Sequence, residues 1–226
     1  IDHYAMLIFA AAVIVIAPKF QMSYGDLLPY ATPGFIAFGA GSLFSGWLGD
    51  KWSRRNMMAI FFIGMGVALM GVALIETPIQ LGMMLLVIGI IASIYHPVGT
   101  AMLVSNVDKL GKEIGINGMW GNFGVASSAL ITGVINEYFG WRAAFWVPGL
   151  ITLIIGILFI KEIPRSVDQI SKKSAAGSAR VPKSVMVWVL ASLVITIIAS
   201  SIAFNSVTVA LPKIFQERLS ALTSNT

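Results

Sequence analysis

Long apolar stretches recur along the chain and are separated by short polar connections. We predict that seven of these stretches are helices that cross a membrane, because each has the roughly 20 residues needed to span a hydrocarbon core of about 30 Å. The predicted spans lie near residues 3–18, 27–49, 57–75, 79–104, 112–136, 141–160 and 184–210. The hydropathy pattern therefore predicts an all-α membrane protein.

One connection differs from the others in being long and polar. Residues 161–183 read KEIPRSVDQISKKSAAGSARVPK, and such a mixture of charged residues with Ser, Ala, Gly and Pro is typical of a flexible aqueous linker. The linker separates six spans in residues 1–160 from one span in residues 184–226. Since residue 1 lies almost inside the first span and the chain stops soon after the seventh, we expect a fragment of a longer protein.

The composition agrees with this prediction and argues against a soluble globule. Hydrophobic residues make up 57% of the chain and charged residues only 11%, against about 45–50% and about 25% in ordinary soluble domains. Zero cysteines exclude disulfides, thiolate metal sites and cysteine nucleophiles, and two histidines supply a catalytic metal cluster poorly. We expect no metal, no cofactor and no enzymatic activity.

The basic residues predict the orientation in the membrane, because Lys and Arg near span ends are retained on the cytoplasmic side. With residue 1 inside, the outer connections hold 4 of the 15 basic residues, namely Lys19, Arg142, Lys213 and Arg218. The inner connections hold the other 11, which are Lys51, Arg54, Arg55, Lys109, Lys112, Lys161, Arg165, Lys172, Lys173, Arg180 and Lys183. The net charge of +5 is thus a topology signal, and no nucleic-acid partner is needed to explain it.

Polar side chains within the spans are the candidate functional residues, because polar groups at membrane depth are costly without a partner. Asp2 and His3 begin the first span, and at about 1.5 Å per residue His96 lies roughly 24 Å inward from Gln80. The first, fourth and fifth spans are therefore predicted to present polar groups at a common level. The candidates for the solute or proton path are His3, Tyr95, His96, Asn117, Trp120, Asn122 and Asn205.

Each of these candidates also has a purely structural interpretation. Histidine titrates near pH 6.5, so His3 and His96 are candidates to carry a proton. A neutral His96 that donates to a backbone carbonyl beside the helix-distorting Pro97 is the alternative. Asn117 and Asn122 either bind solute or bridge helices, and a membrane Trp such as Trp120 more commonly packs against its neighbours.

Small residues recur at helical spacing in two spans. In the second span Ala37, Gly41, Ser45 and Gly49 share one face, and in the fifth span Gly124, Ser128 and Thr132 do the same. Such stripes allow a neighbouring backbone to approach closely. We interpret them as packing surfaces, which are equally compatible with sliding of one helix on another.

The connection between the second and third spans, residues 46–56, reads GWLGDKWSRRN and predicts a tight basic turn. It resembles the signature of the major facilitator superfamily, in which Gly, then Asp four residues on, a basic residue and an Arg pair join helices two and three. Ser53 departs from the Gly usual in that family. The matching residues are Gly46, Asp50, Lys51, Arg54 and Arg55.

The resemblance extends over the whole chain. Residues 95–99, 115–124 and 140–145 look like helices four to six of this superfamily, and most like its fosmidomycin-resistance-like exporters. The resemblance implies twelve helices in two halves, of which this chain is the N-terminal half plus helix seven. It also implies alternating access, with solute between the halves and with the residue 46–56 turn acting as an inner gate whose partner lies in the other half.

Two departures from the family pattern leave the coupling ion open. Leu85 and Leu86 occupy the region of helix four where many proton-coupled members carry an Arg. Ser127 and Ser128 stand near the place of the Gly-Pro pair found in many antiporters. The motifs alone therefore do not establish proton antiport.

The sequence predicts a secondary active transporter of a small organic solute, proton-coupled and suited to metabolite or drug efflux. We expect it to act as a monomer in the bacterial inner membrane, with its N-terminus in the cytoplasm. The alternatives are a seven-helix receptor and a non-transporting sensor on the same fold. A retinal pump would need a Lys within the seventh span, where only Lys213 at the outer end exists, and a receptor would normally start outside.

Overall fold

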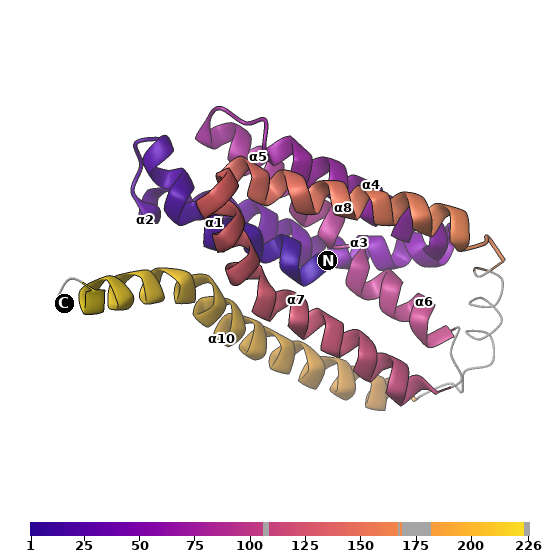
Figure 1. Cartoon of the computed structure of the whole chain (residues 1–226). Coiled ribbons are helices and arrows are strands. Elements are labelled where there is room, and N and C mark those ends of the chain that lie inside the picture. The colour runs from indigo at the N-terminus through magenta and orange to yellow at the C-terminus, as the bar shows by residue number, and fades with distance from the viewer. Residues whose placement is uncertain (106–108, 167, 169–181, 224–226) are drawn as a thin grey trace. The chain divides into compact units, whose positions relative to one another are not determined.

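Helices account for all regular secondary structure in residues 1–105, 109–166, 168 and 182–223, the residues that this computed structural model describes (Figure 1). The chain divides into two units, residues 1–175 and residues 176–226. The described part of the chain confirms the predicted all-α class.

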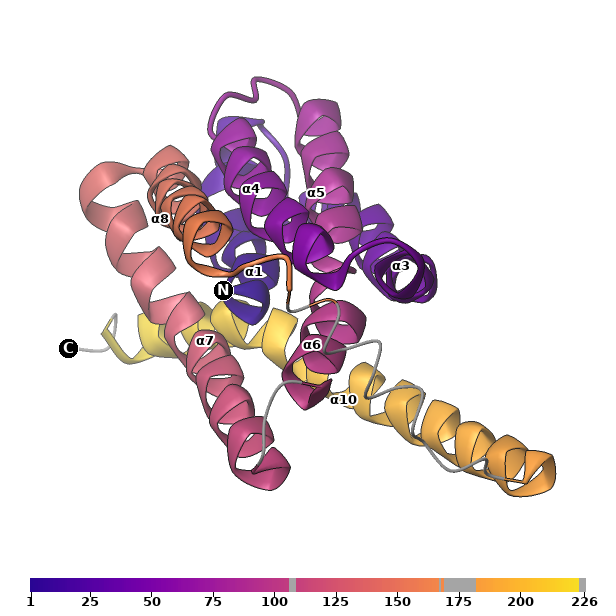
Figure 2. The same ribbon diagram turned by 90° about the vertical axis from the view of Figure 1, so that its right-hand side faces the viewer.

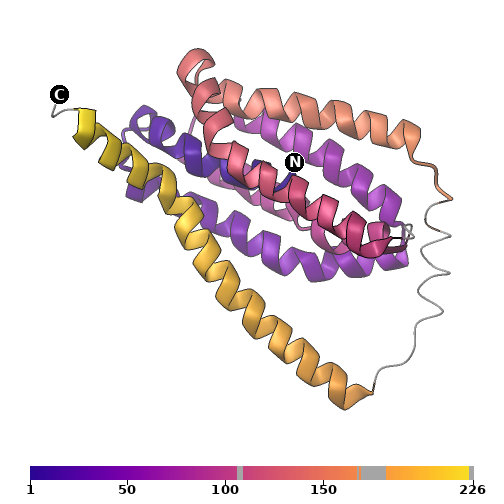
Figure 3. The same ribbon diagram turned by 60° about the horizontal axis from the view of Figure 1, so that its bottom comes forward.

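The helices of the first unit follow the predicted spans closely and add short helical turns between them. The second unit contains α10 (Lys183–Thr223), a continuous helix of 41 residues that extends beyond the predicted end at residue 210 (Figure 3). The helices of the first unit are α1 (Asp2–Lys19), α2 (Tyr24–Leu27), η1 (Leu28–Ala31), α3 (Thr32–Lys51), α4 (Arg54–Val72), α5 (Pro78–Ala92), η2 (Tyr95–Gly99), α6 (Thr100–Ser105), α7 (Leu110–Phe139) and α8 (Trp141–Glu162).

In the described residues six helical segments are long and apolar enough to cross a membrane. The helix that contains the predicted fifth span, α7, is not one of them, although its 30 residues would reach about 45 Å. Gly, Ser, Thr and Asn residues dilute its apolar content. The six segments are Asp2–Lys19, Tyr24–Lys51, Arg54–Val72, Pro78–Ser105, Trp141–Glu162 and Ser184–Ala203.

Local sequence sets several helix boundaries. At the start of α5 Thr77 and Gln80 form a capping box, in which the side chain of each residue accepts a hydrogen bond from the backbone N–H of the other. Pro78 is the first residue of the helix. Gly140 separates α7 from α8 with φ 80°, a left-handed backbone conformation that favours glycine. These signals turn the chain sharply between spans.

The core of the first unit forms where helices pack in pairs. α4 packs on α8, α1 on α7, and α3 on α5, and α1 also contacts α8 (Figure 2). Ile8 of α1, Phe61 of α4 and Phe145 of α8 are all fully buried. Gly66 and Gly149 let α4 and α8 approach so closely that a Cβ atom on Gly66 would lie 2.8 Å from the Gly149 carbonyl oxygen.

The small-residue stripe of the second span is confirmed as a packing surface against the fourth. A Cβ atom on Gly41 would lie 2.6 Å from Ser93 Oγ, and Ser45 Oγ lies 3.0 Å from the same atom. A Cβ atom on Gly49 would lie 2.9 Å from a methyl group of Val98. The stripe therefore brings α3 against α5 and η2.

The stripe of the fifth span faces α1. Gly124, Ser128 and Thr132 are the buried residues of α7. A Cβ atom on Gly124 would lie 3.5 Å from the backbone nitrogen of Tyr4. The stripe thus places α7 directly beside the first turn of α1.

The predicted fourth span is not one continuous α-helix. After α5 the chain forms the π-helix η2 and then the short helix α6. Pro97 lies within η2 and lacks a backbone N–H, which removes one hydrogen bond from a regular α-helix. Short π-helical turns are frequent at functional sites. Here the π turn contains Tyr95 and His96, two of the predicted site residues.

The contact between α3 and α5 gives a first testable prediction. A Cβ atom on Gly89 would overlap the carbonyl oxygen of Gly34, a backbone atom that has no room to move. We expect Gly89→Ala to destabilise the protein by about 1–3 kcal/mol, the usual cost of overpacking. Thermal unfolding of the purified protein in detergent measures this change as a lower midpoint.

The matched control is Gly133→Ala on α7, where an added Cβ atom would meet nothing within 4 Å. This variant is expected to unfold at or above the wild-type temperature, because Ala favours a helix more than Gly does. Equal unfolding midpoints for the two variants would show that the close approach of α3 and α5 does not contribute to the stability of the protein.

Candidate functional site

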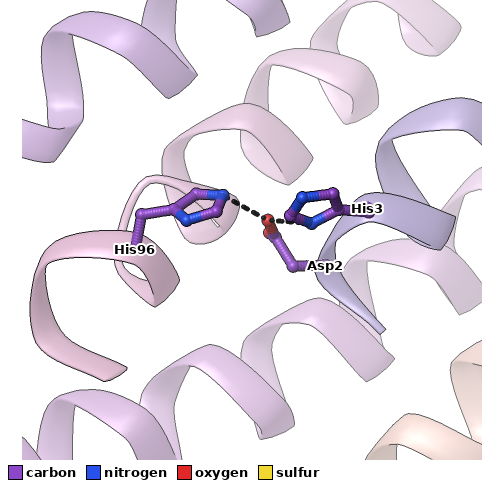
Figure 4. Close-up of side chains that lie close together, drawn as sticks. All are labelled: Asp2, His3 and His96. Atoms are coloured by element: carbon purple, nitrogen blue, oxygen red, sulfur yellow. Dashed lines mark ion pairs between the residues drawn. The ribbon is translucent and has the colours of Figure 1, made fainter. Parts of the chain in front are cut away.

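A buried carboxylate lies at the centre of the polar cluster in the first unit. Asp2, in the first turn of α1, is 3% exposed. Its Oδ2 atom lies 3.6 Å from Nδ1 of His3 and 3.3 Å from Nε2 of His96 (Figure 4). Its Oδ1 atom is buried and has no hydrogen-bond partner among the described residues.

The two imidazole rings meet from different parts of the chain. His3 follows Asp2 on α1, whereas His96 comes from the π-helix η2. Their ring centroids are 5.2 Å apart in an edge-to-face arrangement. They are the only two histidines in the sequence. The polar groups predicted at one level in the first and fourth spans thus meet at the carboxylate of Asp2.

A third span joins the cluster through Tyr95. The hydroxyl of Tyr95 donates a hydrogen bond of 2.8 Å to Oδ1 of Asn117 on α7. Tyr95 and Phe38 lie edge-on to His96, with ring centroids 5.4 and 5.9 Å away. The cluster, which we define as Asp2, His3, Tyr95, His96 and Asn117, therefore connects α1, η2 and α7.

The remaining predicted path residues lie elsewhere on their helices. Trp120 and Asn122 are exposed on α7, where Trp120 is 62% exposed and packs edge-on against Phe123. Asn205 belongs to α10, and its side chain lies outside the described residues. The structure thus gathers four of the seven predicted path residues and leaves Trp120 and Asn122 at the surface of the unit.

Asp2 is the cluster residue to which sequence reasoning gave no role. The sequence places it at the start of the first span, outside the set of predicted path residues. The signal that could have identified it was its position beside one of just two histidines, at the level predicted for the other. The ligand atoms of Asp2, His3 and His96 all lie within 4.8 Å of one another, a spacing that could hold a metal ion.

The basic turn between α3 and α4 is as short as predicted. Only Trp52 and Ser53 separate the two helices. Asp50 Oδ1 accepts hydrogen bonds from Nε of Arg54 at 3.1 Å and from its Nη2 at 2.7 Å. The Nη1 atom of Arg54 also donates to Ser105 Oγ of α6 at 2.9 Å. Arg54 therefore ties the α3–α4 turn to the end of the fourth span.

Arg55 has a different set of partners, although the sequence analysis grouped it with Arg54. It is 8% exposed and donates to the carbonyl oxygens of Ile160 at 2.5 Å and Ile163 at 2.9 Å. These carbonyls lie at the C-terminal end of α8, where backbone acceptors lack helical partners. Arg55 therefore caps α8 within this unit.

Ser53 has a structural use that explains its departure from the family glycine. Its Oγ atom accepts a hydrogen bond of 2.9 Å from the Asn56 backbone and so caps α4. The same hydroxyl donates to Asp168 Oδ2 at 2.5 Å, and the Arg55 backbone N–H donates to Asp168 Oδ1 at 3.1 Å. The departure therefore preserves the turn and adds a contact to the segment after α8.

The other two residues of the turn motif have packing roles. Lys51 Nζ lies 4.6 Å from the centroid of the Trp47 ring, a cation–π contact at the end of α3. A Cβ atom on Gly46 would lie 3.2 Å from Cβ of Pro97 in η2. Gly46 thus allows the π-helix to sit directly against α3.

Together, the apolar helices, the polar cluster between them and the basic turn define a multi-span helical membrane protein. The chain belongs to the major facilitator superfamily, because the model of that family matches residues 3–225. This confirms the resemblance that the turn motif indicated.

Three relatives show the range of proteins to which the chain is similar. Riboflavin transporter RibZ of Clostridioides difficile is 29% identical over 169 residues, 70% of this chain and 35% of that protein. Multi-drug resistance efflux pump PmrA of Streptococcus pneumoniae is 30% identical over 165 residues, which cover 70% of this chain and 41% of that protein. Puromycin resistance protein pur8 of Streptomyces alboniger is 27% identical over 133 residues, which cover 58% of this chain and 26% of that protein. The chain spans less than half the length of these relatives.

The different partners of the two arginines predict different effects of mutation. Arg55→Gln removes the charged donor from two carbonyl oxygens at the end of α8 and is expected to cost about 2 kcal/mol or more. Thermal unfolding of the purified protein, followed by tryptophan fluorescence, should show a clearly lower midpoint.

Lys51→Gln is the matched control for a lost positive charge in the same turn. The contact that it removes is an exposed cation–π pair, worth about 0.5–1 kcal/mol. An Arg55→Gln midpoint no lower than that of Lys51→Gln would contradict the capping role of Arg55.

Proposed function

We propose that this chain is part of a secondary active transporter that moves a small organic solute by alternating access, and that it has no enzymatic activity. The observation that carries the proposal is the family match over residues 3–225. In this proposal residues 1–160 form the N-terminal six-helix half, 161–183 a cytoplasmic linker, and 184–226 the first helix of the other half. Efflux is the favoured direction, by similarity to a named efflux pump; the likeness to fosmidomycin-resistance-like exporters stays a prediction.

The polar cluster supports a solute path on the face of α1, η2 and α7. His3 and His96 have side chains that are 32% and 47% exposed in the described structure, whereas the Asp2 carboxylate beside them is buried. A polar group is retained at membrane depth only where it has a partner or lines a hydrated path. We assign to the solute or proton path His3, Tyr95, His96, Asn117, Trp120, Asn122 and Asn205.

The α3–α4 turn supports the gate of the proposed cycle. Arg54 bridges Asp50 to Ser105 at the end of the fourth span, and Asp50 remains 65% exposed and open to a further donor. A contact made in only one of the two states would bias the equilibrium between them. The proposed gate motif is Gly46, Asp50, Lys51, Arg54 and Arg55. Arg55 stabilises the turn through its hydrogen bonds to the carbonyl oxygens at the end of α8.

The coupling ion is proposed for the transport cycle of the whole protein. Uphill movement of a solute requires an ion that moves downhill in the same cycle and that biases the same conformational equilibrium. We propose the proton as that ion, monomeric action, and a location in the bacterial inner membrane with the N-terminus in the cytoplasm. The excess of basic residues on the connections assigned to the inside, 11 against 4, supports this orientation.

The orientation can be tested directly because the chain has no cysteine. Glu76→Cys, in the exposed turn before α5, is expected to react with a membrane-impermeant maleimide added to intact cells. Lys112→Cys, exposed near the start of α7, is expected to react only after the membrane is opened. The reverse labelling pattern would overturn the proposed topology.

The transport proposal predicts flux that depends on a pH gradient. The full-length protein is reconstituted in liposomes, a gradient is imposed, and the movement of riboflavin, puromycin and ethidium is followed. At least one of the three is expected to move faster with the gradient than without it. Flux of all three at the rate of empty liposomes would count against the transporter and favour a non-transporting sensor.

The polar cluster predicts which variants lose that flux. His96→Gln is expected to lower the gradient-dependent rate at least about tenfold, as expected when a positioned polar group in a site is lost. Glu137→Gln, an exposed acidic residue at the far end of α7, is expected to keep the wild-type rate. Full activity of His96→Gln would assign His96 to packing.

A further inference from the structure

The meeting of both histidines on one buried carboxylate calls for an explanation beyond helix packing. Asp2 and His3 come from α1 and His96 from the π-helix, and their side chains converge on the Oδ2 atom of Asp2 (Figure 4). A carboxylate can accept hydrogen bonds from two imidazoles, but here both rings approach the same oxygen atom while the other oxygen atom has no hydrogen-bond partner among the described residues. The ligand atoms of the three residues lie within 4.8 Å of one another, a spacing that could hold a metal ion.

We propose that Asp2, His3 and His96 bind one divalent transition-metal ion of the zinc type. In four-coordinate zinc sites with bonds of about 2.1 Å, neighbouring ligand atoms are separated by about 3.4 Å. The two distances around Asp2 Oδ2, 3.3 Å to His96 and 3.6 Å to His3, lie on either side of this value. All three ligand atoms lie within 4.8 Å of one another, so one ion can reach them with small side-chain rotations.

The environment of Asp2 favours a cation. The residue is 3% exposed, and a carboxylate in such a place is costly unless it is paired. Its Oδ1 atom has no hydrogen-bond partner among the described residues and is available as a second ligand atom. A bound ion would satisfy both oxygen atoms at once.

The donor set selects the class of ion. Two imidazole nitrogens and one carboxylate suit zinc and its neighbours among the transition metals, whereas magnesium and calcium prefer sites made only of oxygen atoms. Three protein ligands leave at least one position on the ion for water or another ligand. The side chains of His3 and His96 are 32% and 47% exposed, so a further ligand could approach an ion from their exposed side.

Neighbouring side chains hold one of the proposed ligands in place. The rings of Tyr95 and Phe38 lie edge-on to His96, and Tyr95 is fixed by its hydrogen bond to Asn117. A bound ion would therefore link α1 to η2 and, through Tyr95, to α7. His3 and His96 belong to both proposals, but Zn²⁺ binding and solute flux are measured separately, so the two proposals can fail separately.

The test is a binding measurement on the full-length protein, purified with a tag that contains no histidine. Isothermal titration with Zn²⁺ is expected to show one ion per chain. Asp2→Asn and His96→Gln are each expected to weaken binding at least about tenfold, because each removes one ligand. Glu137→Gln, an exposed carboxylate away from the cluster, is the matched control and is expected to bind as the wild type does.

A second readout separates lost ligands from lost folding. Zn²⁺ is expected to raise the thermal unfolding midpoint of the wild type and of Glu137→Gln, and at the same concentration to raise those of Asp2→Asn and His96→Gln clearly less. Circular dichroism without metal shows whether the variants are folded. Bound Co²⁺ should also give visible absorption bands in the wild type that a folded His3→Gln variant lacks.

Two results would overturn the proposal. One is the absence of Zn²⁺ binding by the wild type, in which case the three residues form only an ion-pair and hydrogen-bond cluster. The other is binding that Asp2→Asn and His96→Gln leave unchanged, which would place the ion elsewhere. Should a folded variant be unobtainable, no Co²⁺ absorption and no Zn²⁺-dependent shift in the wild type would have the same effect.

Discussion

Polar groups buried among apolar helices must find their partners within the chain, and this requirement shapes the described structure. Asp2 is held by two histidines, and Arg55 by the last carbonyls of α8. The exposed side chain of Arg142 also finds its partners within the chain, because it donates to the carbonyl oxygens of Ala73 at 3.0 Å and Ile75 at 3.1 Å, just beyond α4. Apart from the pair of Asp2 with the adjacent His3, each contact joins segments far apart in the sequence. These polar contacts add to the apolar packing that holds the helices together.

Close contacts between helix backbones allow these polar side chains to reach one another. Gly34 and Gly89 bring α3 against α5, and Gly46 and Gly49 bring the end of α3 against η2. Because a larger residue at these positions would push the π-helix away, the glycines determine how far it reaches into the unit. On the other side Gly124 lies beside the first turn of α1, where an added Cβ atom would make only an ordinary contact, 3.5 Å from the backbone nitrogen of Tyr4. Close glycine packing therefore positions the π-helix side of the polar cluster.

One broken span links the cluster to the basic turn. Tyr95 and His96 lie in η2, and a few residues later Ser105 at the end of α6 accepts a hydrogen bond from Arg54. A shift of this span would therefore change the contacts of Asp2 and the contacts of the α3–α4 turn together. Such coupling between a site and a distant contact would serve the two-state cycle that we propose. The π-helix with Pro97 is the place where the span departs from regular helical geometry.

The sequence by itself determined the helical class, the approximate positions of most helices and the basic turn, because hydropathy, charge and glycine patterns are local or periodic. It also predicted that three spans present polar groups at one level, from the rise per residue alone. Only the tertiary structure decided that Asp2 lies between His3 and His96, and that Arg54 and Arg55 have different partners. Those outcomes depend on helix rotation and on the π turn, and both are set by packing between segments that the sequence does not place side by side.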